Sequence, residues 1–191
     1  MHGWMKKGMV LAVLVMVMYQ AVSAVQLMSK EKAVKRMFLT AESTSEETKK
    51  LSPAQLEAVK TRLGGTLYAM KKPSSAVEDE YTFIFAEKGG EKVGVAVIEE
   101  QEDKWGPLSF IIVLDPKTGK VSNAAMLKYV DGRARNLANR AWLKEFFDKG
   151  LDDPLKVGKD ISAVSGASVS CDILCFIVKK VMTLYKVLYL E

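Results

Sequence analysis

Four serines surround one glycine in the stretch ISAVSGASVSCDILC, residues 161–175, which leads directly into a long apolar pattern. A glycine in a turn lets the backbone approach a ligand closely, and the start of a helix offers free N–H groups and the positive end of its dipole. Such a site suits a phosphate. The hydroxyls of Ser165, Ser168 and Ser170 could donate hydrogen bonds to phosphate oxygens, and one of them could be esterified. Alternatively, Ser168 or Ser170 simply caps the helix.

The first 24 residues have the three-part layout of a secretory signal. Lys6 and Lys7 give a basic start, an apolar run covers residues 9–18, and Val-Ser-Ala at 22–24 predicts cleavage after Ala24. The run is short for a membrane-spanning helix, which needs about 20 apolar residues, and an uncleaved membrane anchor is the alternative. Either way, we expect the rest of the chain to be exported, in the periplasm or at the outer face of the cytoplasmic membrane.

Histidine-dependent chemistry is excluded once that signal is removed, because the one histidine is His2. The remaining chain lacks the base of a Ser-His-Asp triad, the partner of a Cys-His pair and the ligands of a haem or His-rich zinc site. A serine hydrolase using Ser168 would also lack a Gly-x-Ser-x-Gly turn. We therefore expect no catalytic residue and no metal ligand in this chain, and no substrate turnover by it alone.

The composition predicts a folded domain without affinity for nucleic acid. The 191 residues are 49% hydrophobic and 27% charged, which argues against global disorder. The formal charge is only +5, and no polybasic run carries interleaved aromatic residues.

The elements that must position the serine turn are expected mainly after residue 80. Strands over 81–87 and 92–100 flank the turn KGGE, and strands over 108–115 and 120–130 flank PKTG. We expect a helix over 139–150 and a final helix over 169–189. The predicted fold class is α+β: an antiparallel β-sheet meander packed by helices, with a long C-terminal helix.

Some finer features of these elements are also predicted. The final helix should carry a polar face with Lys179, Thr183 and Lys186, opposite an apolar arc that includes Phe176. Cys171 and Cys175, one turn apart, are poorly placed for a disulfide, and the helix start could lower the pKa of Cys171.

The residues before the meander are expected to form a separate helical extension. A short helix over 30–38 is followed by a polar, linker-like segment over 40–50. A second helix over 51–65 begins with Ser52, Pro53 and Gln55, the pattern of a capping box. The predicted organisation is a signal peptide or anchor at 1–24, a helical N-terminal extension at 25–80 and a domain at 81–191.

The segment SAVSGASVSC resembles the flavinylation motif of the FMN-binding domain family. That family includes the small flavin subunits of the sodium-pumping NADH:quinone reductase and of the related Rnf complex. Its pattern is Asp, two residues, Ser-Gly-Ala-Thr, any residue, and Thr or Ser. Further blocks are similar in the same order, roughly from Trp105 to Lys186: WGPLSFIIVLDPKTGKV, KYVDGRARN and WLKEFFDKGLDDPLKVGKDI.

The resemblance implies that FMN is joined through its phosphate to the hydroxyl of Ser168 by an FAD-dependent flavin transferase. Gly166 and Ala167 would shape the close approach, and Ser165 and Ser170 would contact the phosphate or cap the helix. The chain would then be an extracytoplasmic electron carrier with a membrane or periplasmic redox partner, rather than a stand-alone enzyme.

Three further residues could contact the flavin. Arg133 and Arg135 lie in the loop that resembles a flavin-proximal loop of the family, where a guanidinium could bind phosphate or stabilise a reduced ring. Trp105 could stack on the ring. The alternatives are a solvated basic loop and a tryptophan buried at a strand end.

Two positions depart from the family pattern. Ser168 stands where the family usually has threonine, and Ser162 stands where it has aspartate. The second departure favours another hypothesis, a non-redox scaffold or partner-binding module that keeps the fold without covalent flavin.

Overall fold

The computed structural model describes residues 23–70 and 79–191. It contains a six-stranded antiparallel sheet in the order β1-β6-β5-β4-β3-β2. The strands are β1 (Val25–Gln26), β2 (Ser43–Lys50), β3 (Glu80–Lys88), β4 (Glu91–Asp103), β5 (Gly106–Leu114) and β6 (Val121–Tyr129). The helices are α1 (Lys30–Met37), α2 (Pro53–Arg62), α3 (Arg140–Leu143) and α4 (Ser168–Tyr185), with short 3₁₀ helices η1 (Gly132–Ala138) and η2 (Lys144–Phe146) and a π-helical end η3 (Lys186–Leu190). The predicted α+β class, the antiparallel meander and the long C-terminal helix are confirmed.

The meander runs from β3 to β6. Between β3 and β4, Gly89 and Gly90 both have positive φ, +60° and +79°, as a two-residue hairpin turn of the right twist requires. The capping box of α2 forms as predicted: Ser52 Oγ accepts from Gln55 N, and Gln55 Oε1 accepts from Ser52 N.

The segment over 40–50 was expected to be a linker, and this expectation is wrong. Residues 43–50 form β2, which pairs with β3 along its whole length. An edge strand whose side chains are mostly exposed needs no apolar alternation, and charged residues on such an edge discourage pairing with other chains. Together, β1 and β2 place part of the predicted N-terminal extension in the same sheet as the meander.

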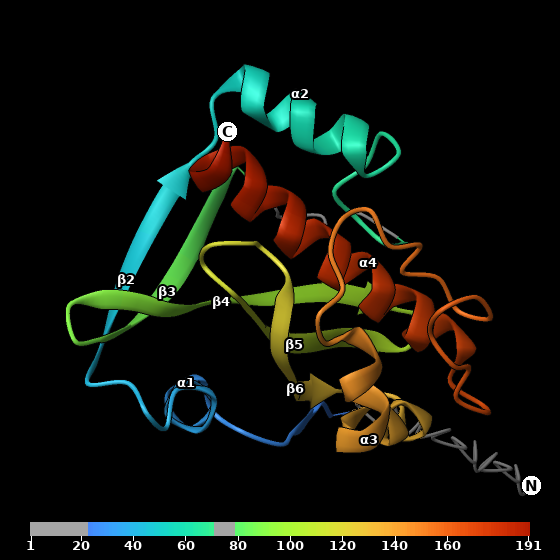
Figure 1. Cartoon of the computed structure of the whole chain (residues 1–191). Helices are drawn as coiled ribbons and strands as arrows, with labels where there is room; N and C mark the ends of the chain where they lie inside the picture. Colours follow the sequence, from blue (N-terminus) through green and yellow to red (C-terminus); the bar gives the residue numbers. More distant parts are fainter. Residues whose placement is uncertain (1–22, 71–78) are drawn as a thin grey trace, which may run out of the picture.

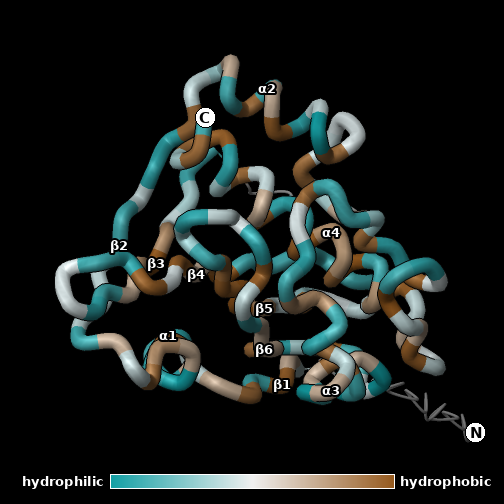
Figure 2. The backbone as a smooth tube through the Cα atoms, viewed as in Figure 1, coloured by the Kyte–Doolittle hydropathy of each residue, from teal (hydrophilic) through white to brown (hydrophobic). Residues whose placement is uncertain are grey.

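Helices cover both faces of the sheet (Figure 1). On one face α4 packs against Phe83, Phe110 and Ile112, with α2 packed against α4. On the other face, α1 covers a smaller cluster that contains Ile84 and Ile111. Figure 2 shows the corresponding apolar colouring on the strands and on α4.

The polar face predicted for the final helix is only partly correct. Thr183 is fully buried and its hydroxyl donates to Lys179 O at 2.7 Å, whereas Lys180, which was not placed on that face, is fully buried. Phe176 is only partly buried. The physical reason is that α4 lies between the sheet and α2, so burial is not confined to one stripe.

The helix expected over 139–150 is shorter than predicted. It consists of α3 and η2, and the chain leaves helical geometry at Phe147. Beyond that point, Asp148 N donates to Val121 O and Val121 N donates to Lys149 O. Backbone pairing with the start of β6 therefore replaces the last helical turn.

The expected signal segment lies outside the described residues, except for Ser23 and Ala24. Within 23–70 and 79–191, no helix combines the length and the apolar character needed to cross a bilayer.

Candidate functional site

The serine turn opens α4 without a side-chain cap. Gly166 has a φ of +76°, a conformation that residues with a Cβ rarely adopt. Ala167 occupies the cap position and Ser168 is the first helical residue, with no side-chain hydrogen bond at the cap. The alternative in which Ser168 or Ser170 caps the helix is therefore wrong, and no side chain caps the first N–H groups of α4.

The serine hydroxyls of this turn have different environments. Ser170 is 3% exposed, and its hydroxyl donates to Asp103 Oδ2 at the end of β4. Ser165 and Ser168 are exposed. The hydroxyl of Ser170 is thus committed to the protein, while those of Ser165 and Ser168 face solvent.

Ser168 lies in a hollow of about 220 Å³, which we call the Ser168 hollow. Three elements meet there: the start of α4, the β4–β5 hairpin and the start of η1. Trp105 is 51% exposed, so it is not the buried strand-end residue considered as an alternative. The hollow is lined by Asp103, Lys104, Trp105, Asp131, Arg133, Gly166, Ala167, Ser168, Val169 and Ser170.

Cationic groups flank the Trp105 ring. Lys104 Nζ lies 5.0 Å from the ring centroid and Arg133 Cζ lies 5.9 Å from it, both within the range of a cation–π contact. The exposed ring therefore presents a flat aromatic surface in a partly positive setting.

Arg133 is fixed by Asp131 and is not part of a purely solvated loop. Arg133 Nε donates to both carboxylate oxygens of Asp131 at 3.0 Å, and Asp131 Oδ1 also accepts from Arg133 N at the cap of η1. The side-chain hydrogen bonds from Arg133 hold the pKa of Asp131 below its ordinary value, and Asp131 raises the pKa of Arg133. The pair keeps the guanidinium near Trp105 and Gly166.

A second hollow of about 390 Å³, the Arg135 hollow, is lined by other residues of η1 and the turn. Its lining is Arg135, Asn136, Asn139, Trp142, Val164 and Ser165. The sequence-predicted residues are thus divided. Trp105, Arg133, Gly166, Ala167, Ser168 and Ser170 share the Ser168 hollow, whereas Arg135 and Ser165 line the other one.

Four residues of the Ser168 hollow were not singled out from the sequence: Asp103, Lys104, Asp131 and Val169. Asp131 could have been found, because an aspartate directly before Gly-Arg-Ala is a typical helix cap. Asp103 carries no such signal, since its contact with Ser170 joins residues 67 positions apart.

Ser162, where the flavinylation pattern described above has aspartate, makes two backbone hydrogen bonds to side chains of α3 and η2. Ser162 N donates to Glu145 Oε2 at 2.6 Å, and Trp142 Nε1 donates to Ser162 O at 2.8 Å. Asp160 is engaged elsewhere: its carboxylate accepts from Leu155 N and Lys156 N. The carboxylate that contacts residue 162 is therefore that of Glu145, which accepts a hydrogen bond from the backbone N–H of Ser162.

Neither cysteine is poised for reaction. Cys171 and Cys175 are both buried and free, in agreement with the prediction of no disulfide. Burial raises the pKa of Cys171 and raises that of Cys175 to about 12. The suggestion that the helix start lowers the pKa of Cys171 is therefore wrong, because desolvation of the thiolate outweighs the helix dipole.

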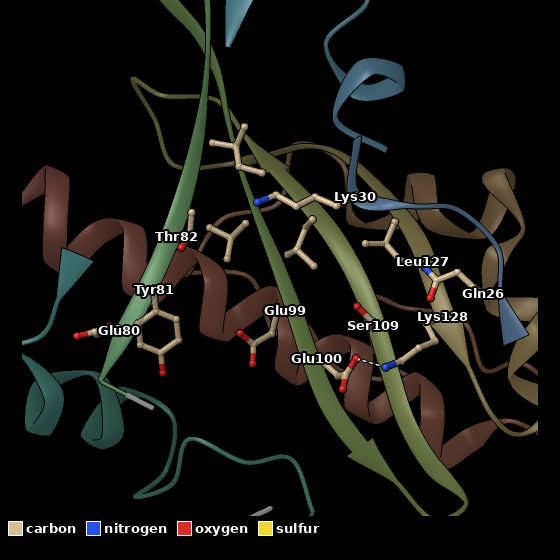
Figure 3. Close-up of a pocket in the computed structure, with 13 residues that line it drawn as sticks. Gln26, Lys30, Glu80, Tyr81, Thr82, Glu99, Glu100, Ser109, Leu127 and Lys128 are labelled. Atoms are coloured by element: carbon tan, nitrogen blue, oxygen red, sulfur yellow. Dashed lines mark ion pairs between the residues drawn. The ribbon is translucent and has the colours of Figure 1, made fainter. Parts of the chain in front are cut away.

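A hollow of about 530 Å³ lies on the face of the sheet that carries α1 and contains none of the predicted site residues (Figure 3). Ile84, Ile98 and Leu127 contribute to its lining, and Lys128 pairs with Glu100 at 2.6 Å beside it. In the described part of the chain, no three side chains of His, Cys, Asp or Glu are grouped as a metal site would need.

Comparison with solved structures finds a similar fold in NqrC of Shewanella oneidensis, whose crystal structure superposes with a TM-score of 0.50. The two chains are 14% identical, and the match covers 81% of this chain and 84% of NqrC. At this identity, the likeness establishes the fold. No family model matches the chain, and no curated protein matches it.

Proposed function

We propose that this chain is an extracytoplasmic flavoprotein electron carrier with FMN attached through a phosphoester to Ser168. The observation that carries the proposal is the exposed hydroxyl of Ser168 at the uncapped start of α4, in a hollow shared with Trp105 and Arg133. The fold shared with NqrC and the flavinylation-like motif support the same type of protein.

The residues of the Ser168 hollow fit a phosphate and a flat ring. Free N–H groups in the first turn of α4 and the helix dipole favour the phosphate, and Gly166 allows its close approach. Trp105 offers its exposed face to the ring, and Arg133 supplies positive charge beside it. FMN supplies one- and two-electron chemistry, while the protein supplies attachment and tuning of the potential.

Attachment requires an FAD-dependent flavin transferase. The Ser168 oxygen forms an ester with the flavin-side phosphorus of FAD as the pyrophosphate bond breaks. AMP leaves, and the serine proton passes to solvent. Serine offers the same nucleophile as the family's threonine but lacks its stiff χ1.

The test is co-expression of the full chain with an active transferase, followed by flavin fluorescence in a denaturing gel and mass spectrometry of the peptide that contains Ser168. We expect an adduct that survives denaturation. Ser168→Ala should abolish it and Ser168→Thr should retain it. Ser165→Ala should have less effect, because backbone N–H groups can replace a phosphate contact. Ser162→Asp should raise the modified fraction.

The second candidate is the scaffold or partner-binding module without flavin. Ser162 favours it, because the flavinylation pattern has aspartate at this position. Here the backbone N–H of Ser162 donates to the Glu145 carboxylate instead. An unmodified peptide, from cells in which a motif-bearing control protein is modified, would reject covalent attachment and leave this candidate. An adduct on Ser165 would preserve the carrier function and reject Ser168 as the acceptor.

Export is part of the proposal, and cleavage after Ala24 is compatible with the fold. Val25 is the first residue of β1, where it pairs with Tyr129, so a chain that begins at Val25 keeps the whole sheet. Intact mass of the protein from a host with a secretory pathway should give Val25 as the N-terminus. Recovery of the chain from Met1 in the cytosol would contradict export.

A further inference from the structure

The Arg135 hollow contains an unneutralised positive charge. Arg135 is exposed and makes no ion pair with any described residue, and no acidic side chain lines the hollow among the described residues. Arg133, two positions earlier on η1, differs sharply because Asp131 holds it by hydrogen bonds and an ion pair at 2.9 Å. The charge of Arg133 is therefore neutralised by Asp131, whereas the charge of Arg135 is available to a ligand.

The polar groups around Arg135 are mainly hydrogen-bond donors. Asn139 Oδ1 already accepts from Ala141 N at 2.8 Å, which leaves the Asn139 amide nitrogen as the group available to a ligand. The Asn136 amide and the Ser165 hydroxyl lie on the same lining. A guanidinium supplies a planar fork of N–H groups that matches the two oxygens of a carboxylate or phosphate. An oxyanion is the ligand that could accept from all of these groups together.

The size and walls of the Arg135 hollow suit a small organic molecule. Its volume of about 390 Å³ lies in the range of roughly 300 to 1,000 Å³ typical of ligand pockets. Val164 and Trp142 add apolar surface. Trp142 is held in place by its hydrogen bond to Ser162 O and its edge contact with Phe146. These two contacts fix the position of the Trp142 side chain.

We propose that the Arg135 hollow binds the carboxylate or phosphate group of a small anionic molecule other than the attached flavin. The hollow is adjacent to the proposed flavin site, because Ser165 lines one hollow and Gly166 lines the other. A ligand held by Arg135 would lie across the glycine turn from Ser168. The binding depends on Arg135, Asn136 and Asn139, and it does not require that the flavin be present.

The experiment titrates inorganic phosphate, and separately acetate, into the full chain carrying Ser168→Ala, at low ionic strength. Binding is followed by ¹⁵N-resolved amide shifts and by calorimetry. We expect saturable shifts at Ser165 and Asn136. Arg135→Gln should weaken binding by about tenfold or more, which corresponds to about 1.4 kcal/mol. Asn136→Asp should abolish it by placing a negative charge in the hollow.

The matched control is Arg133→Gln, which removes the same charge from the same short helix but from the other hollow. Phosphate affinity at the Arg135 hollow, followed by the amide shifts of Asn136 and Asn139, should change by less than about twofold, whatever Arg133→Gln does to phosphate binding at the Ser168 hollow. Equal losses at Asn136 and Asn139 for the two arginine variants would mean that general electrostatics accounts for the binding and would overturn the proposal, as would non-saturable shifts at these residues.

A second arm uses flavin-loaded wild-type protein, which separates the two possible sources of the phosphate group. Retained phosphate binding supports a site for a separate molecule. Loss of binding on loading would show that the flavin's own phosphate fills the Arg135 hollow, and it would overturn the proposal while leaving the carrier function intact.

Discussion

Helix α4 makes polar contacts with β4 near its middle and at its start, and the two places differ in burial, in charge and in access to solvent. In the middle of the helix, Lys180 Nζ lies 2.7 Å from Glu99 Oε1, and both side chains are buried. At the start, Ser170 donates to Asp103 beside the open Ser168 hollow. Glu99 and Asp103 are four residues apart on β4, so their side chains lie on the same face of the strand. One strand therefore supplies the acidic partner of both contacts.

The central contact belongs to a wider buried network. Gln101 Nε2 donates to Glu99 Oε1 at 2.6 Å and to Leu67 O at 3.2 Å, and Gln101 Oε1 accepts from Ala69 N at 2.9 Å. Helix α4, strand β4 and the segment after α2 are thereby joined. A buried ion pair costs desolvation, but it also favours one register of the helix over its neighbours. The middle of the helix is therefore held to the sheet by a buried polar network, whereas its start borders the Ser168 hollow.

The largest expected effect comes from breaking the central contact. Lys180→Met leaves the Glu99 carboxylate buried without its neutralising cation and should lower the free energy of unfolding by about 3–5 kcal/mol. Urea denaturation of the full chain measures this. Adding Glu99→Leu should recover much of the loss, because two apolar residues can replace a buried pair. Lys179→Ala, at the less buried neighbouring position, is the control and should change stability by less than about 0.5 kcal/mol. A loss from Lys180→Met no larger than that of the control would refute the contrast.

A smaller effect is expected at the helix start. Ser170→Ala removes a buried hydroxyl that donates to a carboxylate and should cost about 1.5–3 kcal/mol. Ser168→Ala is the matched control: its hydroxyl is exposed and caps nothing, so the change in unflavinylated protein should stay within about 0.5 kcal/mol. The two variants are compared by the midpoint of urea denaturation. Equal midpoints for the two would mean that Ser170 contributes no more than Ser168.

The weakest effect is a pH dependence contributed by Asp131. Its pKa is lowered in the folded protein by the hydrogen bonds from Arg133, so the folded state binds the proton less readily than the unfolded state. The stabilisation is therefore present above the unfolded value, about 3.9, and is lost as the pH falls through the folded pKa. Asp131→Asn should lower stability at pH 7 and bring the variant and the wild type together near pH 2. A constant difference across this range would exclude the linkage.

The sequence predicted the meander because each pair of its strands alternates in the expected way and is separated by a glycine turn. It predicted α2 equally well, because the capping box is a local signal. It failed at β2, where Ser43–Lys50 has no apolar face and its pairing with β3 is a long-range event. It also failed along α4, where Thr183 and Lys180 are buried because a second layer, α2, covers the helix.

At the site, the sequence by itself determined the residue types and the turn: a glycine that needs positive φ, a hydroxyl at Ser168 and the start of a helix. Those features are encoded within a few neighbouring residues. Only the tertiary structure decided that the Ser170 hydroxyl donates to Asp103 and that Arg133 forms an ion pair with Asp131. It also decided that Arg135 lines a separate hollow. These outcomes depend on how the β4–β5 hairpin and η1 pack against the start of α4. Contacts between segments so far apart in the sequence produce no periodic or local sequence pattern.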